Sequence, residues 1–304
     1  MHDPAELYVL TEDADGVPEG LPLVAGLTGF ADAGSAVSQL NEFVHETLDG
    51  TLIASFDADE LLDYRARRPV FTFDQDHISE VTPPRLSLHL MRDDLGQSFL
   101  FLSGFEPDFQ WQRFTEALLG VARRFAVSST TWVHAIPMPV PHTRPLQVTV
   151  SGNRADLIES LSVWRPVTQA PANVLHLFEH RLHEAADPVA GFVILVPHYL
   201  ADTEFPDAAV TALSSISSAT GLIFPTDRLR EQGREFLLKV EEQVAGNHEL
   251  SRLVGTLEER HDTYMEGNPL PSPLTDQDGQ VPTADDLAAE LEKFLATRRL
   301  DDDA

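Results

Sequence analysis

Hydrophobic and polar positions along the chain alternate between short apolar runs and longer amphipathic stretches. The clearest apolar run covers residues 21–27 and has the length of a buried strand. A Gly-rich turn over residues 26–34 follows, and apolar residues then recur every three to four positions up to Leu48, the period of a helix with one buried side. Asp32 precedes this helix and can accept hydrogen bonds from its first N–H groups. The pattern predicts the first half of a βαβ unit.

Further apolar runs alternate with helical stretches as far as Pro225. Residues 86–91 and 98–102 read as a β-hairpin, because Asp-Asp-Leu-Gly between them is turn chemistry. The other expected strands are residues 6–10, 51–56, 70–73, 130–136, 147–150 and 192–196, and helices are expected near 114–125, 171–185 and 207–219. Such alternation predicts an α/β fold with a mostly parallel central sheet flanked by helices.

The chain changes character near Pro225. Two amphipathic stripes separated by Gly246-Asn247 predict a helical hairpin over residues 226–265. The Pro- and Asp-rich residues 266–282 read as a linker, and residues 283–304 as a terminal amphipathic helix with an acidic tail. We therefore expect an α/β core over residues 1–225 followed by a C-terminal helical extension.

Charge and composition exclude several classes of protein. The 21 Lys and Arg residues face 49 Asp and Glu residues, so the net charge of −28 argues against nucleic acid and anionic membranes as partners. No apolar run approaches the ~20 residues that span a bilayer, and the N-terminus lacks the pattern of a signal peptide. Cys is absent, which rules out a thiol nucleophile and fits a cytoplasmic location.

The Gly-rich turn does not match a known phosphate-binding loop. Gly29 and Gly34 have the separation of a P-loop, but Ser35 stands where that loop needs Lys. The Gly-x-Gly start of a dinucleotide site is also missing. The turn could still hold an anion or carboxylate at the helix N-terminus, or the glycines could serve only the turn and Asp32 only the cap.

Polar residues gather just after the predicted strands. Because the carboxyl ends of parallel strands share one edge of a sheet, we expect a cleft there. Carboxylates, imidazoles and guanidinium groups in one cleft would suit acid–base or anion-binding chemistry, although loops at strand ends are polar in any case. The ligand-binding candidates are Gly29, Asp32, Gly34, Arg68, Glu106, His142, Arg144, His198 and Tyr199, and none receives a catalytic role.

Two His patterns in the sequence resemble metal sites. His176, His180 and His183 follow one another at helical spacing, but apolar residues occupy the opposite side, so we expect all three to face solvent. His45-Glu46 begins like a zinc-protease motif, but Asp49 stands where the second His is required. Neither a metal nor a cofactor is expected.

Several phrases together resemble one family. LPLVAGLTGFADAGSA, FDADELLDYRARRP, GFEPDFQW, PHTRP and VPHYLA, in this order, resemble the PAC2 family (proteasome assembly chaperone 2-like, DUF75), closest to its actinobacterial branch. The resemblance spans about residues 5–265. It implies an α/β core similar to nucleoside phosphorylases and a homo-oligomer, with a trimer as an expected form. The family takes its name from chaperones that help to assemble proteasome rings.

Two hypotheses of function follow. The first is a binding or assembly protein, chaperone-like, that recognises a protein partner. The second is an enzyme acting on an anionic or nucleoside-like small molecule in the cleft. The resemblance and the lack of a catalytic motif favour the first. The apolar stripe of the terminal helix would be covered either by its own core or by a neighbouring copy.

Overall fold

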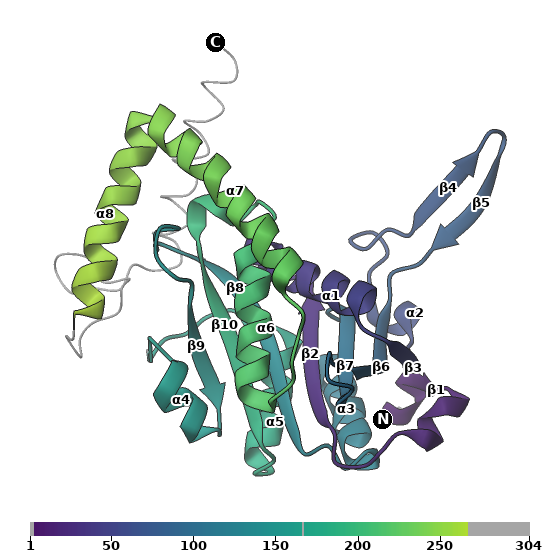
Figure 1. Cartoon of the computed structure of the whole chain (residues 1–304). Coiled ribbons are helices and arrows are strands. Elements are labelled where there is room, and N and C mark those ends of the chain that lie inside the picture. Colours follow the sequence, from purple (N-terminus) through teal and green to yellow (C-terminus); the bar gives the residue numbers. More distant parts are fainter. Residues whose placement is uncertain (1–2, 166, 267–304) are drawn as a thin grey trace.

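The computed structural model describes residues 3–165 and 167–266, and its centre is an eight-stranded sheet (Figure 1). Counted from the edge formed by residues 8–10, the fourth to seventh strands run parallel to one another, whereas the neighbouring pairs at both ends of the sheet are antiparallel. The expected α/β fold is thus confirmed, with its parallel part in the middle. From edge to edge the strands are β1 (Tyr8–Leu10), β3 (Gly50–Phe56), β6 (Leu86–Arg92), β7 (Ser98–Phe105), β2 (Pro22–Thr28), β8 (Ser129–Met138), β10 (Val189–Pro197) and β9 (Gln147–Gly152).

Helices cover both faces of this sheet and enclose a core on each side. α1 (Ala36–Thr47) and α6 (Pro206–Thr220) pack on one face, and α3 (Trp111–Arg124) and α5 (Val174–Glu184) pack on the other. Val24 belongs to the first core and its neighbour Leu23 to the second, because successive residues of a strand point to opposite faces. Two short helices, α2 (Ala58–Leu61) and α4 (Ala155–Leu161), complete the core.

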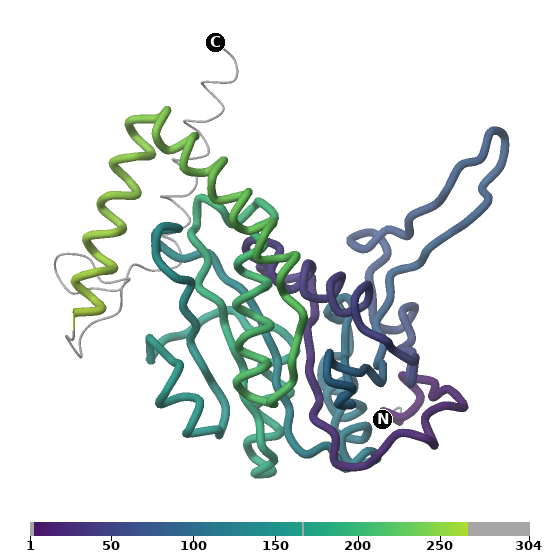
Figure 2. Tube along the Cα trace, in the orientation of Figure 1, coloured from purple at the N-terminus to yellow at the C-terminus, as the bar shows by residue number. Residues whose placement is uncertain are grey.

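The predicted helical hairpin is present as α7 (Asp227–Gly246) and α8 (His248–Met265), which diverge from each other in Figure 2. Asn247 separates them, and its side chain accepts hydrogen bonds from the first N–H groups of α8. α7 lies so close to α6 that a Cβ atom on Gly233 would be 2.1 Å from an oxygen of Asp207. The boundary near residue 225 stays a prediction. The terminal helix and all but the first residue of the linker lie outside the described residues.

A second, two-stranded sheet projects from the core (Figure 2). It consists of β4 (Val70–Asp74) and β5 (His77–Thr82), of which the sequence predicted only the first strand. The antiparallel register places Phe71 opposite Val81 and Phe73 opposite Ile78, so these four apolar side chains share one face. All four are exposed, by 56–63%. We call them the apolar face of the hairpin.

Candidate functional site

The turn after β2 is built mainly for structure. Gly29 and Gly34 have positive φ angles of 128° and 67°, which glycine adopts without a steric penalty. The two carboxylate oxygens of Asp32 accept hydrogen bonds from the N–H groups of Val37 (2.7 Å) and Ser38 (2.9 Å). Asp32 therefore caps α1 as the sequence predicted, and its charge is used within the fold.

Gly34 joins this turn to the loop after β10. Its N–H donates to the carbonyl of Ala201 (2.8 Å), and its own carbonyl accepts from the N–H of Phe205 (2.9 Å). A Cβ atom at this position would lie 3.2–3.4 Å from side-chain atoms of three neighbours. The conformation and the close packing account for glycine here without a ligand.

Glu106 follows β7 and is the most deeply buried of the predicted acidic residues, with 7% exposure. One carboxylate oxygen accepts a 2.6 Å hydrogen bond from the N–H of Val174, the first residue of α5. Burial raises the pKa of Glu106, although this hydrogen bond and Arg67 oppose the rise. The carboxyl group is thus held at the N-terminus of a helix, with its pKa above the ordinary value.

Arg67, and not the predicted Arg68, lies beside Glu106. Its guanidinium group is 3.3 Å from the carboxylate of Asp108 and stacks over the ring of Phe105 at 5.2 Å. It also lies against Gly29, where a Cβ atom would come within 2.5 Å of it. The side chain of Arg68 is exposed. After α2, Arg67 therefore packs against the core, whereas Arg68 points to solvent.

Two histidines, one on β8 and one on α5, belong to the same group of residues. The ring of His134 on β8 is 3% exposed and stacks on Phe30 at 5.8 Å, with an angle of 5° between the rings. Burial lowers the pKa of His134 to about 4, so its ring is neutral. His176 lies 6.3 Å away and forms a capping box with Asn173. We call Glu106, Arg67, Phe30, His134 and His176 the Glu106 cluster.

The prediction that His176 faces solvent is wrong. Its ring packs edge-on against Trp132 at 4.7 Å, and burial lowers its pKa. The capping box turns this side chain back over the helix N-terminus, where α5 meets the edge of the sheet. His180 and His183 are exposed as predicted. Within residues 3–165 and 167–266, no group of three potential ligands is placed to hold a metal ion.

His142 and Tyr199 form a second pair at the same edge of the sheet. The hydroxyl of Tyr199 accepts from the backbone N–H of His142 (2.8 Å) and lies 2.7 Å from Nδ1 of its ring. If the hydroxyl donates to Nδ1, the ring carries its proton on Nε2. Burial lowers the pKa of His142 and raises the pKa of Tyr199 to about 12. His198 packs edge-on against Tyr199 at 5.4 Å.

Arg144 connects this pair to α8. Its guanidinium group makes hydrogen bonds of 2.8 and 2.6 Å to the carboxylate of Asp262 and one of 3.3 Å to Glu258. These bonds hold the pKa of Asp262 at about 2. The charge of Arg144 is therefore used to anchor α8. We call His142, Arg144, His198 and Tyr199 the His142 cluster.

Five of the nine predicted residues thus belong to the two clusters, namely Glu106, His142, Arg144, His198 and Tyr199. That the clusters face one shared cleft stays a prediction. Sequence reasoning found Glu106 and the His142 cluster because each follows a strand. It missed Arg67, His134 and His176. The spacing of Trp132 and His134, two residues apart and so on one face of β8, was the available signal.

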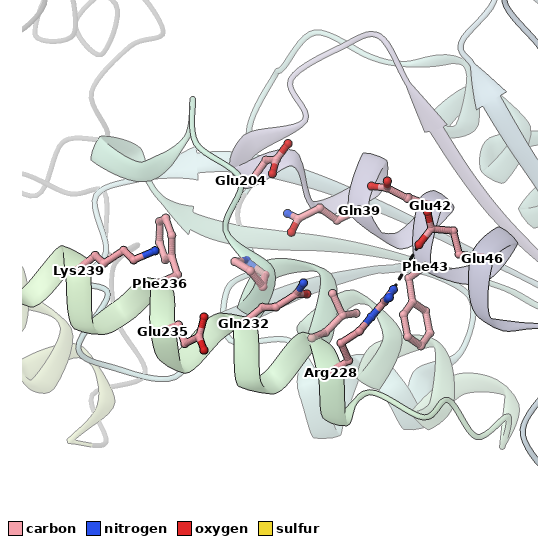
Figure 3. Close-up of a pocket in the computed structure, with 12 residues that line it drawn as sticks. Gln39, Glu42, Phe43, Glu46, Glu204, Arg228, Gln232, Glu235, Phe236 and Lys239 are labelled. Atoms are coloured by element: carbon pink, nitrogen blue, oxygen red, sulfur yellow. Dashed lines mark hydrogen bonds and ion pairs between the residues drawn. The ribbon is translucent and has the colours of Figure 1, made fainter.

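A groove lies between α1 and α7, and it was not predicted from the sequence (Figure 3). It has a volume of about 400 Å³ and a mixed polar and apolar lining, and Arg228 on α7 bonds to Glu46 on α1 at 3.3 Å across it. Because the two helices lie far apart in sequence, no local pattern reveals it. The lining residues are Gln39, Glu42, Phe43, Glu46, Glu204, Pro206, Arg228, Leu229, Gln232, Glu235, Phe236 and Lys239.

Comparison with solved structures gives close matches. A protein of unknown function from Corynebacterium glutamicum is 34% identical, with 86% of this chain and 98% of that chain covered and a TM-score of 0.82. An unknown-function protein of Mycobacterium tuberculosis is 37% identical, with coverages of 88% and 94% and a TM-score of 0.80. No curated protein matches the chain.

A proteasome-assembly chaperone homologue of Mycobacterium tuberculosis is also similar. It is 24% identical, with 77% of this chain and all of that chain covered and a TM-score of 0.70, so this likeness concerns the fold. The model of the PAC2 family matches residues 26–244, which contain every strand of the sheet except β1 and the first part of β2. The resemblance seen in the sequence is confirmed, and the chain belongs to the PAC2 family.

Proposed function

We propose that this chain is a protein-binding, assembly-chaperone-like factor that works in the cytoplasm as a homo-oligomer, with a trimer as the expected form. The apolar face of the β4–β5 hairpin carries the proposal. A single two-stranded hairpin is marginally stable in water, and a cluster of exposed apolar side chains marks an interaction surface. Phe71 and Phe73 at 56% and 63% exposure form the centre of such a surface.

The occupant that we assign to this face is a second copy of the chain. The hairpin projects away from the core, and the helices within residues 3–165 and 167–266 leave its apolar face exposed. Two copies with a net charge of −28 repel each other, and an interface between them must therefore be apolar at its centre. The hairpin supplies an apolar centre. Added salt screens the repulsion and should tighten the assembly.

Light scattering of the full chain at moderate salt tests the oligomer. The wild type is expected to have the mass of an oligomer, and the double variant Phe71→Ser/Phe73→Ser the mass of a monomer. Thr72→Ala, on the opposite face of β4, is the matched control and should behave as wild type. A monomeric wild type would refute the oligomer. An oligomer that survives the double substitution would show that another surface holds it together.

The partner class that we propose is the proteasome. It rests on the similarity to the proteasome-assembly chaperone homologue and on a net charge that disfavours nucleic acid. Purified proteasome core particles and their unassembled α subunits from Mycobacterium tuberculosis, the source of two similar structures, serve as probes. Co-migration of the oligomer with either probe on gel filtration is expected. If the protein migrates alone with both, the assembly role falls and the oligomer stands.

The Glu106 cluster supports a second candidate function, an enzyme acting on an anionic or nucleoside-like small molecule. Glu106, whose pKa is raised, bonds to the first residue of α5, and the neutral His134 contacts His176 on the same helix, so the cluster contains the groups of an acid–base site. Native mass spectrometry of the purified chain tests this. A small molecule retained by the wild type and lost in Glu106→Gln is expected. Retention of the same molecule by both proteins would place its site elsewhere.

A further inference from the structure

A third group of polar residues lies on the face of the sheet that packs against α1. The register of β6 and β7 places Ser87 opposite Ser103 and His89 opposite Phe101, so these four side chains point to the same face. Ser103 is 4% exposed. None of them belongs to the Glu106 cluster or the His142 cluster. The fold therefore brings a buried serine and a histidine together on a surface with no assigned role.

His45, in the last turn of α1, completes this group. Its Nε2 lies 2.8 Å from the hydroxyl oxygen of Ser103. The ring is held by an edge-on contact with His89 at 4.8 Å and a tilted contact with Phe101 at 5.6 Å. His45 itself is exposed, so the pair is reached from solvent on the side of the helix. A serine within hydrogen-bond distance of an oriented histidine has the geometry of an activated nucleophile.

The electrostatic surroundings keep the imidazole groups neutral. Burial and, to a smaller extent, the nearby Arg85 lower the pKa of His45. The same causes, together with His45, lower the pKa of His89 to about 4. A neutral His45 can accept the proton of the serine hydroxyl through Nε2, and Arg85 contributes a positive charge near both histidines. Nδ1 of His89 and Oδ1 of Asn41 are buried without a hydrogen-bond partner within the described residues.

The neighbouring strand leaves this face open. On β3, Ser55 lies opposite Ser87 and Leu52 opposite His89, and both are exposed, Leu52 by 38%. No helix of the described part of the chain buries them, and α1 contacts β2 and β8, nearer the middle of the sheet. A small acyl group and its leaving alcohol could therefore lie over β3 and β6 beside the serine.

We propose that Ser103 and His45 form a nucleophile–base pair that accepts the acyl group of small, activated esters. The hydroxyl oxygen of Ser103 attacks the ester carbonyl while Nε2 of His45 takes the hydroxyl proton. The bond from the carbonyl carbon to the leaving oxygen breaks, and the alcohol departs with the proton from His45. Water then attacks the acyl-serine, His45 takes a proton from that water, and the carboxylic acid leaves as Ser103 recovers its hydrogen.

The probe for this activity is p-nitrophenyl acetate, added to the full-length chain, with peptide mass mapping of the product. An acetyl group on Ser103 is expected, together with release of nitrophenolate. Ser103→Ala removes this acetylation, and His45→Asn lowers its rate on the order of 100-fold, the usual contribution of a general base. Ser98→Ala, at the other end of β7, is the matched control and keeps the wild-type rate.

Circular dichroism of each variant shows whether it is folded, and the mapping on wild-type protein does not depend on any variant. The proposal is overturned if acetylation of the wild type spares Ser103. It is equally overturned if a folded His45→Asn variant acetylates Ser103 at the wild-type rate, because the 2.8 Å hydrogen bond is then only structural.

Discussion

β10 and the β4–β5 hairpin both carry large apolar side chains, but their surroundings are opposite. Eight of the nine residues of β10 are buried, while all eleven residues of β4 and β5 are exposed. β10 pairs with a strand on each side and packs under helices on both faces, whereas β4 and β5 pair only with each other. Apolar sequence thus makes a strand in both places, but only the layers around β10 make it part of a core.

The two regions are therefore stabilised by different kinds of contact. The free energy that holds β10 is set within one chain, by contacts that are present at any protein concentration. If a second copy covers the hairpin, as we propose, its apolar contacts come from another molecule and its stability depends on concentration. The same substitution should therefore have unequal effects in the two regions.

The largest effect is expected for Phe192→Ala in β10. Phe192 has no exposed surface, and truncation of a buried Phe costs about 3–5 kcal/mol through lost burial and a cavity. Phe73→Ala in the hairpin, matched in chemistry and 63% exposed, should cost less than about 1 kcal/mol. Urea unfolding at a concentration where the chain is monomeric measures both. Equal costs would mean that the hairpin is covered within its own chain.

Dilution tests whether the hairpin holds two copies of the chain together. The wild type should dissociate on dilution, and Phe73→Ser should raise its dissociation constant about tenfold, which corresponds to about 1.4 kcal/mol of lost contact. Sedimentation velocity over a concentration series measures this constant, with Thr72→Ala as the control. A dissociation constant unchanged by Phe73→Ser would place the interface elsewhere.

A smaller effect on stability is expected from a buried carboxyl group on α5, the helix that packs next to β10. Glu179 on α5 accepts hydrogen bonds from the indole of Trp132 (2.7 Å) and the hydroxyl of Ser151 (2.8 Å), and burial raises its pKa. Above the unfolded pKa near 4.5, the folded state holds a proton that the unfolded state has lost. Stability should therefore fall as pH rises from this value through the folded pKa of Glu179.

Glu179→Gln keeps an acceptor for both hydrogen bonds and removes the titration, so the fall of stability with pH should become shallower. Glu106 and Asp207 also have raised pKa values, so part of the slope should remain. Thermal unfolding from pH 4 to 8 measures the slope, and Glu184→Gln, an exposed change on the same helix, is the control. An unchanged slope in Glu179→Gln would assign the whole effect to the other carboxyl groups.

The smallest effect is expected at α8, which has few buried residues and is held partly by hydrogen bonds from Arg144. Arg144→Gln removes the bonds to Asp262 and Glu258 and should speed hydrogen exchange in the second half of α8 several-fold, without changing β10. Arg252→Gln, an exposed change on α8, is the control. Exchange that stays at the wild-type rate would mean that contacts such as that of Tyr264 with Val163 suffice.

The core could be predicted from sequence because its signals are local. The apolar run before α1, the turn of the β6–β7 hairpin and the Asn247 break each lie within a few residues, and the strand-end rule found Glu106 and His142. What was missed depends on distant parts of the chain. Arg67 replaces Arg68 through its contacts with Gly29 and Asp108.

The hairpin and the histidines were missed for the same reason. β5 is polar enough at Ser79 and Glu80 to read as a loop, and only its pairing with β4 makes it a strand. His176 was placed by its helical period, but its contact partner, Trp132, lies on a strand 44 positions earlier. Periodicity alone contains no information on such contacts.

The tip of the β4–β5 hairpin also offers a place to modify the molecule. The chain reverses at Gln75, which has a positive φ of 52°, and the residues on both sides of it are exposed. Exposed loop tips tolerate insertions well, because no buried backbone group loses its partner. A fluorescent label or short peptide tag inserted at Gln75 should leave the α/β core folded. It would also turn the hairpin into an optical sensor for whatever molecule covers its apolar face.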